Sequence, residues 1–171
     1  TGRGISADHT GEMFGFSHSD TQDKAVFENA DINAVLIATP HSSHAALATR
    51  ALEAGKATLC EKPLGLNQGE VLSLYGAAAR NNVLLVEALM YVMHPRMHLA
   101  RKLVSDGEIG TVTGFSSGFG FSFPFTPEHR LYNRDRAGGG MLDIGIYPIS
   151  LSSMLFGKPE EIVTTWHKGK T

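Results

Sequence analysis

The chain has 171 residues, of which 42% are hydrophobic and 19% are charged, and its formal net charge is -2. This composition supports a hydrophobic core and argues against global disorder, and the absence of a basic stripe argues against a nucleic-acid partner. A single cysteine excludes an internal disulfide and predicts a reducing, cytoplasmic location, and no apolar run reaches the roughly 18 residues of a membrane span.

The polar residues 1–30 show no periodicity that predicts an element. The sequence begins with Thr-Gly-Arg-Gly rather than with methionine, so we expect it to be a piece of a longer protein. The elements predicted next are, in chain order, a strand at 33–39 buried on both faces, a helix at 41–54 followed by Gly55, a strand at 56–60, a helix at 67–81 capped by Asn67, and a strand at 83–86. This β-α-β-α-β order predicts an α/β fold with neighbouring parallel strands, a partial Rossmann-type sheet.

The pattern changes after about residue 91. The predicted elements are a helix at 97–104, a long strand at 111–123, a polar loop at 124–137, a helical run that opens at the glycines 138–140 and ends at 156, and the start of a strand at 162–167. We therefore expect a partial dinucleotide-binding domain over 1–91. The start of a substrate-binding α+β domain with a mixed or antiparallel sheet should follow over 92–171.

Two short polar patterns directly follow predicted strands. Thr39, Pro40 and His41, with His44 close behind, come after the first strand, where ligands of open α/β sheets bind. An ordinary turn with solvated histidines fits equally well, and a metal at His41 and His44 lacks a third ligand, so no metal site is predicted.

Glu61-Lys62-Pro63 follows the second strand. An ammonium group at this edge of the sheet could bind a substrate hydroxyl and favour its ionisation. The simpler alternative is a solvent-exposed lysine before a turn-forming proline.

The third pattern is Gly-Gly-Gly-Met-Leu-Asp-Ile-Gly-Ile-Tyr-Pro, residues 138–148. Its glycines would let the backbone approach a ligand closely. Asp143 and Tyr147 are four residues apart and share a face of a helix. A tyrosine hydroxyl beside a carboxylate and a lysine is a plausible proton-transfer group, whereas the alternative is a capped helix with an exposed aspartate and a half-buried tyrosine.

Taken together and in this order, the three patterns closely resemble the glucose-fructose oxidoreductase/inositol dehydrogenase/MocA (Gfo/Idh/MocA) family, over roughly residues 25–167. The resemblance implies hydride transfer between NAD or NADP and a small sugar, polyol or cyclic diol, and a possible homo-oligomer. It implies that Thr39, Pro40 and His44 line the cofactor near its ribose and nicotinamide. Glu61 and Lys62 would face the nicotinamide and substrate, with Lys62-Pro63 a cis peptide. Asp143 would bind substrate hydroxyls, and Tyr147 would transfer the proton.

Three departures from the family pattern keep a rival hypothesis open. No G-x-G-x-x-G fingerprint precedes Asn33, Val92 stands where relatives commonly carry arginine, and the second domain is short. The leading hypothesis is an NAD(P)-dependent oxidoreductase or a fragment of one. The rival is a non-catalytic remnant or binding module that holds no dinucleotide, and a histidine-based metal hydrolase is a weaker third.

Overall fold

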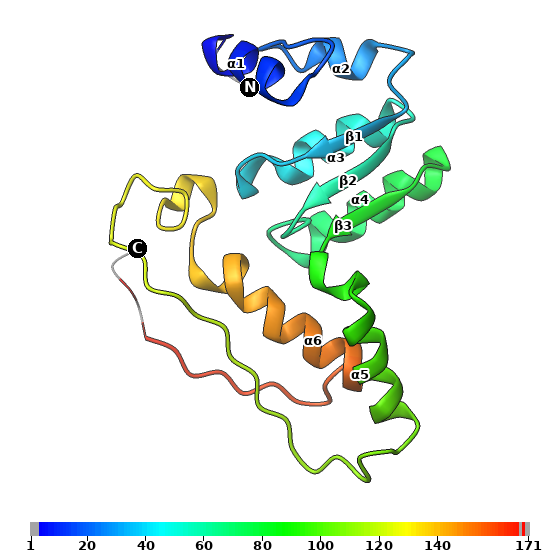
Figure 1. Cartoon of the computed structure of the whole chain (residues 1–171), viewed down its shortest axis with the longest axis vertical. Helices are drawn as coiled ribbons and strands as arrows, with labels where there is room; N and C mark the ends of the chain where they lie inside the picture. The colour runs from blue at the N-terminus through cyan, green and yellow to red at the C-terminus, as the bar shows by residue number, and fades with distance from the viewer. Residues whose placement is uncertain (1–3, 168, 170–171) are drawn as a thin grey trace.

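A three-stranded parallel sheet forms the centre of the N-terminal half (Figure 1). The structure is a computed structural model that describes residues 4–167 and 169. The strands β1 (Ala34–Ile37), β2 (Ala57–Glu61) and β3 (Leu85–Ala88) are adjacent in chain order, and both pairs are parallel. The prediction of three neighbouring parallel strands is therefore confirmed, with the third strand beginning two residues later than expected.

Two helices connect these strands. A 3₁₀ turn, η1 (His41–Ser43), leads into α3 (His44–Glu53), and α4 (Gln68–Asn81) joins β2 to β3. Asn67 is the N-cap of α4 as predicted, since its side chain accepts a hydrogen bond from the backbone N–H of Glu70 at 3.0 Å. The residues that follow β1 lead into α3, and those that follow β2 lead into α4. Each of these segments is thus held between a strand and a regular helix.

The core lies on one face of the sheet. Both helices pack against each other and against this face, which carries Ile37 and Cys60 opposite one another in the register. Leu36 and Leu59 point to the other face and are exposed. The prediction that the first strand is buried on both faces is wrong for the described chain, because no described helix covers that second face.

The polar N-terminal segment forms two helices that the sequence did not predict, α1 (Gly4–Phe14) and α2 (Lys24–Glu28). They lie beside the β1 end of the sheet in Figure 1. The guanidinium of Arg50, on α3, binds the Asp23 carboxylate at 2.5 and 3.0 Å. The buried Lys56 ammonium donates to two backbone carbonyls in the loop before β1, each at 2.7 Å. These contacts attach the segment to the sheet.

All regular elements that the structure describes in the second half, after β3, are helical. The elements are η2 (Met90–Met93), α5 (Pro95–Ser105), η3 (Arg134–Arg136), a single π-helical turn η4 (Met141–Gly145) and α6 (Ile146–Phe156). The helices predicted at 97–104 and up to 156 are confirmed. Pro148 lies in the first turn of α6, directly after the π turn, where its missing N–H costs no hydrogen bond within that helix.

The strands predicted at 111–123 and 162–167 are not formed. Within the described chain these segments pair with no other strand, so the expected second sheet is absent from residues 4–167 and 169. Instead, rings of the first segment pack on α6, with Phe115 against Phe156 and Phe119 against Tyr147, both at 5.2 Å between ring centroids. An apolar alternating segment becomes a strand only where a partner offers backbone hydrogen bonds. No described helix is both long enough and apolar enough to cross a membrane.

Candidate functional site

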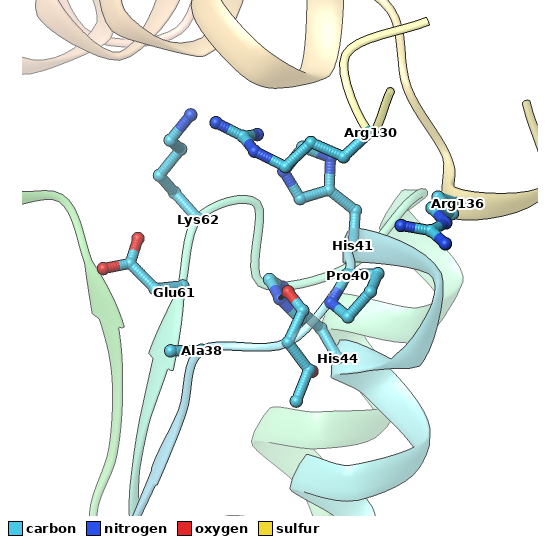
Figure 2. A pocket seen from close by; sticks show the side chains of 9 residues that line it. Ala38, Pro40, His41, His44, Glu61, Lys62, Arg130 and Arg136 are labelled. Carbon is cyan, nitrogen blue, oxygen red and sulfur yellow. Dashed lines mark hydrogen bonds between the residues drawn. The ribbon is translucent and has the colours of Figure 1, made fainter. Parts of the chain in front are cut away.

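A cavity of about 360 Å³ opens at the carboxyl ends of β1 and β2 (Figure 2). Three residues that follow β1, two at the end of β2, the first turns of the helix after β1, and one loop of the second half surround it. The lining residues are Ala38, Thr39, Pro40, His41, His44, Glu61, Lys62, Arg130 and Arg136. All three polar patterns of the sequence therefore meet at or beside one cavity, because Asp143 and Tyr147 contact Lys62 directly.

Lys62 and Asp143 form the centre of the site. The Lys62 ammonium donates to the backbone carbonyl of Asp143 and to its Oδ1, the latter at 3.1 Å. The two side chains are only 14% and 8% exposed, so the pair is largely removed from water. The Lys62–Pro63 peptide is cis, as the resemblance implied. A lysine directly after a buried strand thus has its ammonium fixed by the second half of the chain.

A second cation, Arg130, shares the same carboxylate oxygen. Its Nη1 lies 3.1 Å from Asp143 Oδ1, and Figure 2 shows Lys62 and Arg130 extending toward one another while Glu61 turns away. Burial alone would raise the pKa of Asp143. Hydrogen bonds from Lys62 and Arg130, together with their positive charges, outweigh that effect and lower the pKa below its ordinary value. Asp143 is therefore an ionised carboxylate between two cations.

The ring of Tyr147 completes this group. Its centroid lies 5.2 Å from the Lys62 ammonium, within range of a cation–π interaction. Phe119 contacts the ring edge-to-face and Tyr91 packs at 5.9 Å. The Tyr91 hydroxyl is 2.6 Å from the Ser150 hydroxyl on α6. The expected convergence of Lys62, Asp143 and Tyr147 is thus present, while their catalytic roles remain predictions.

His41 lines the cavity as a neutral side chain. Its Nδ1 donates to the carbonyl of Ala137 at 3.1 Å, and its Nε2 lies 3.9 Å from Asp143 Oδ1. Burial lowers the pKa of His41 and outweighs the carbonyl contact and the Asp143 charge, which raise it. The contact between His41 and Asp143 is therefore not an ion pair at neutral pH.

His44 is the most buried member of the group. It is fully inaccessible to solvent, and its two ring nitrogens lie 2.8 Å from the carbonyl of Pro63 and 2.9 Å from the carbonyl of Thr39. Its polar contacts are therefore made with the protein backbone. The proposed contact between this side chain and a cofactor stays a prediction.

Thr39, Pro40 and Glu61 lie where the sequence patterns placed them, at the ends of β1 and β2. The hydroxyl of Ser43 lies 2.7 Å from both the Thr39 hydroxyl and the Pro40 carbonyl, which closes the turn before α3. All three residues border the cavity. Their contribution to cofactor binding is likewise a prediction.

Sequence reasoning missed Arg130 and Arg136, because both lie in a loop without periodicity. The position of these arginines shortly before the glycine motif is the one sequence feature that could have placed them near the site. The loop also explains Gly138, since a Cβ there would lie 2.6 Å from the carbonyl oxygen of Arg130. The first glycine of the motif is therefore required by a close approach of protein backbone rather than of a ligand. In the described part of the chain, no group of three or more His, Cys, Asp or Glu residues could hold a metal ion.

Both halves of the chain match one family. Residues 6–89 match the oxidoreductase family with an NAD-binding Rossmann fold, and residues 97–170 match the GFO/IDH/MocA C-terminal domain. The chain belongs to the Gfo/Idh/MocA family of oxidoreductases.

Several relatives have named activities. The chain is 38% identical over 137 residues to trans-1,2-dihydrobenzene-1,2-diol dehydrogenase of Mus musculus, covering 79% of the chain and 40% of the relative. It is 37% identical over 146 residues to dTDP-3,4-didehydro-2,6-dideoxy-alpha-D-glucose 3-reductase of Streptomyces violaceoruber, covering 85% and 42%. The chain therefore spans less than half the length of these relatives.

Solved structures agree with this assignment. A 3-ketoreductase from Actinomadura kijaniata in complex with NADP and TDP-benzene superimposes with a TM-score of 0.81 and 33% identity, over 91% of the chain and 47% of that protein. Levoglucosan dehydrogenase in complex with NADH and levoglucosan gives 0.79 and 28%, over 92% and 44%.

Proposed function

We propose that the protein is an NAD(P)-dependent oxidoreductase acting on the CH–OH group of a sugar, polyol or cyclic diol. The observation that carries the proposal is the meeting of Lys62, Asp143 and Tyr147 beside one cavity at the carboxyl ends of parallel strands. Ligands of open α/β sheets bind at this edge. The named activities of the dihydrodiol and sugar relatives support the substrate class.

The cavity fits the reactive end of a nicotinamide cofactor. Its volume of about 360 Å³ lies in the usual range for small-molecule sites, and a threonine, a proline and a glutamate border it. Thr39, Pro40 and Glu61 would flank the nicotinamide, and His44 would support that wall from behind. NAD or NADP, when bound, supplies the hydride acceptor or donor.

The residues of this chain would handle the proton and the charge on the substrate oxygen. Reduction of a carbonyl adds a hydride to carbon and a proton to oxygen, and we assign that proton to the Tyr147 hydroxyl; in the oxidative direction the Tyr147 phenolate would take the proton back from the substrate hydroxyl. The Lys62 ammonium, oriented by Asp143, would hydrogen-bond the substrate oxygen and stabilise the negative charge that develops there. Arg130 adds a second positive charge at the same place.

The two halves of the chain would serve different parts of this reaction. Residues 1–91 would belong to the dinucleotide-binding domain and 92–171 to the substrate domain. We place the protein in the cytoplasm, in line with its single buried cysteine, and allow a homo-oligomer.

The test is a steady-state assay of NAD(P)H formation with cyclic diols and sugars, combined with calorimetric titration of the cofactor. Both are made on the chain joined to the strand and glycine loop that its family carries upstream, because the bare chain should bind the cofactor weakly or not at all. We expect Lys62→Ala and Tyr147→Phe to lower turnover by about 10²-fold or more, the usual scale for a lost proton-transfer group. Lys102→Ala on α5 and Tyr75→Phe on α4 are matched exposed controls and should leave turnover unchanged. If the protein shows no cofactor binding and no turnover with any of these substrates, the proposal is wrong and the non-catalytic binding module is favoured.

A further inference from the structure

The turn Lys62-Pro63-Leu64 is held by two side chains outside the group that would touch the substrate. It connects β2 to the segment before α4, and its first residue supplies the ammonium of the site. Among the described residues, neither of its two backbone anchors, the Pro63 carbonyl and the Leu64 N–H, is bound by the backbone of a neighbouring strand. Both are bound by side chains, His44 from α3 and Glu87 from β3.

His44 connects the turn to the end of β1. Nδ1 is 2.8 Å from the Pro63 carbonyl and Nε2 is 2.9 Å from the Thr39 carbonyl. A carbonyl oxygen only accepts hydrogen bonds, so both bonds form together only when both ring nitrogens carry hydrogen. The ring is fully buried, so its contacts with the two carbonyls and the surrounding packing set its place between the two loops.

Glu87 holds the turn from the opposite strand. Its Oε1 accepts the backbone N–H of Leu64 at 2.8 Å. β3 and β2 are paired with Glu87 opposite Cys60, so the carboxylate reaches past the end of β2 to the turn. Leu64 itself is part of the hydrophobic core, which fixes the far side of the turn.

We propose that His44 and Glu87 are positioning residues for Lys62. His44 acts through the Pro63 carbonyl and Glu87 through the Leu64 N–H, and together they hold the Lys62 ammonium against Asp143. This inference rests on the proposed function only in giving Lys62 a chemical task. It assigns His44 a role through the protein backbone rather than through contact with a cofactor.

Substituting His44 by an amide residue tests its two possible hydrogen bonds, to the Pro63 carbonyl and to the Thr39 carbonyl, one at a time. The side-chain NH₂ of asparagine falls near the position of Nδ1, and that of glutamine near Nε2. His44→Asn thus keeps a donor for Pro63, whereas His44→Gln keeps one for Thr39. For Glu87, Glu87→Gln keeps an acceptor oxygen for Leu64 and Glu87→Ala removes it.

The readout is the acetylation rate of Lys62 in the 171-residue chain, measured by mass spectrometry of peptides after brief treatment with an N-hydroxysuccinimide ester of acetate. The 14% exposed, ion-paired Lys62 should react slowly, and the exposed Lys24 and Lys102 give the reference rates. We expect His44→Gln and Glu87→Ala to raise the Lys62 rate by up to about tenfold, the change that one lost hydrogen bond produces, and His44→Asn and Glu87→Gln to stay within about twofold. His98→Asn and His98→Gln, on the exposed side of α5, should change nothing.

The buried Lys56 reports unfolding in the same experiment, because it is 4% exposed and should remain unlabelled in every folded variant. If a His44 variant exposes Lys56, the Glu87 pair decides the question. The proposal is overturned if His44→Asn raises the Lys62 rate as much as His44→Gln does, or if Glu87→Ala leaves it at the wild-type level. The measurement needs neither cofactor nor turnover, so a lack of dehydrogenase activity would refute the proposed function without affecting this result.

Discussion

Replacing Asp143 by asparagine tests the electrostatic centre of the site. The substitution keeps the shape of the side chain and removes the charge that pairs with Lys62 and Arg130, each 3.1 Å from the same oxygen. Removing one partner of a buried ion pair typically lowers the free energy of unfolding by about 3–5 kcal/mol, because a cation is left uncompensated. The Arg130 side chain is 56% exposed and water screens it, so the Lys62 contact dominates and we expect a loss of about 2–3 kcal/mol.

The loss of stability caused by Asp143→Asn should also change with pH, and the direction of that change follows from the pKa of Asp143. The pKa of Asp143 is lowered in the folded protein, because the contacts with Lys62 and Arg130 outweigh the burial that would raise it. A carboxyl group with a depressed folded-state pKa stabilises the fold above its unfolded value, and this contribution is lost as the pH falls through the folded value. The cost of Asp143→Asn should therefore be complete at neutral pH and should shrink as the pH falls below the ordinary value of 3.8.

Urea unfolding followed by circular dichroism, at neutral pH and at several acidic pH values, measures both effects. Asp106→Asn is the matched control, because Asp106 pairs with Lys102 at i,i+4 on α5 and both side chains are exposed. We expect this control to cost less than about 1 kcal/mol. An Asp143→Asn variant that loses no more stability than the control, or whose loss is independent of pH, would refute the electrostatic account of the site.

Three further predictions concern packing and reactivity. Gly138→Ala should lower the free energy of unfolding by about 2 kcal/mol or more, because its Cβ would lie 2.6 Å from a loop carbonyl, whereas Gly140→Ala meets no atom within 4 Å and should be close to neutral. Leu52→Ala should lose about 2–5 kcal/mol in urea unfolding because Leu52 is fully buried, while Leu72→Ala on the exposed face of α4 should stay within about 0.5 kcal/mol. Burial, with smaller contributions from neighbouring glutamates, raises the pKa of the Cys60 thiol to about 12, so iodoacetamide should label it in urea but not in the native protein at mildly alkaline pH, and rapid native labelling would contradict the packing around β2.

The parallel sheet, its helices and the positions of the three polar patterns can be predicted from local features of the sequence. Short apolar runs separated by helical segments leave few arrangements other than a parallel sheet, since consecutive parallel strands need a crossover between them. The ends of these strands then lie at one edge, which is why Thr39, Glu61 and Lys62 border the same cavity. Local signals such as the Asn67 cap and the glycine after α3 predict the helix ends correctly, because each acts within a few residues.

The fate of residues 111–123 was decided by the tertiary structure. Their alternating phenylalanines predict a strand, but a strand needs a partner, and in the described chain the rings pack on α6 instead. The exposure of Leu36 and Leu59 has the same origin, because burial of the second sheet face depends on what covers it.

The tertiary structure also decided how the site residues contact one another. Arg130 reaches Asp143 from a loop without periodicity, and His44 reaches Pro63 across 19 positions of the chain. Such contacts depend on the distance between segments in three dimensions, and no local pattern in the sequence encodes that distance. The sequence thus specifies which residues stand at the edge of the sheet, and the packing of the second half against that edge determines which carboxylate pairs with which cation.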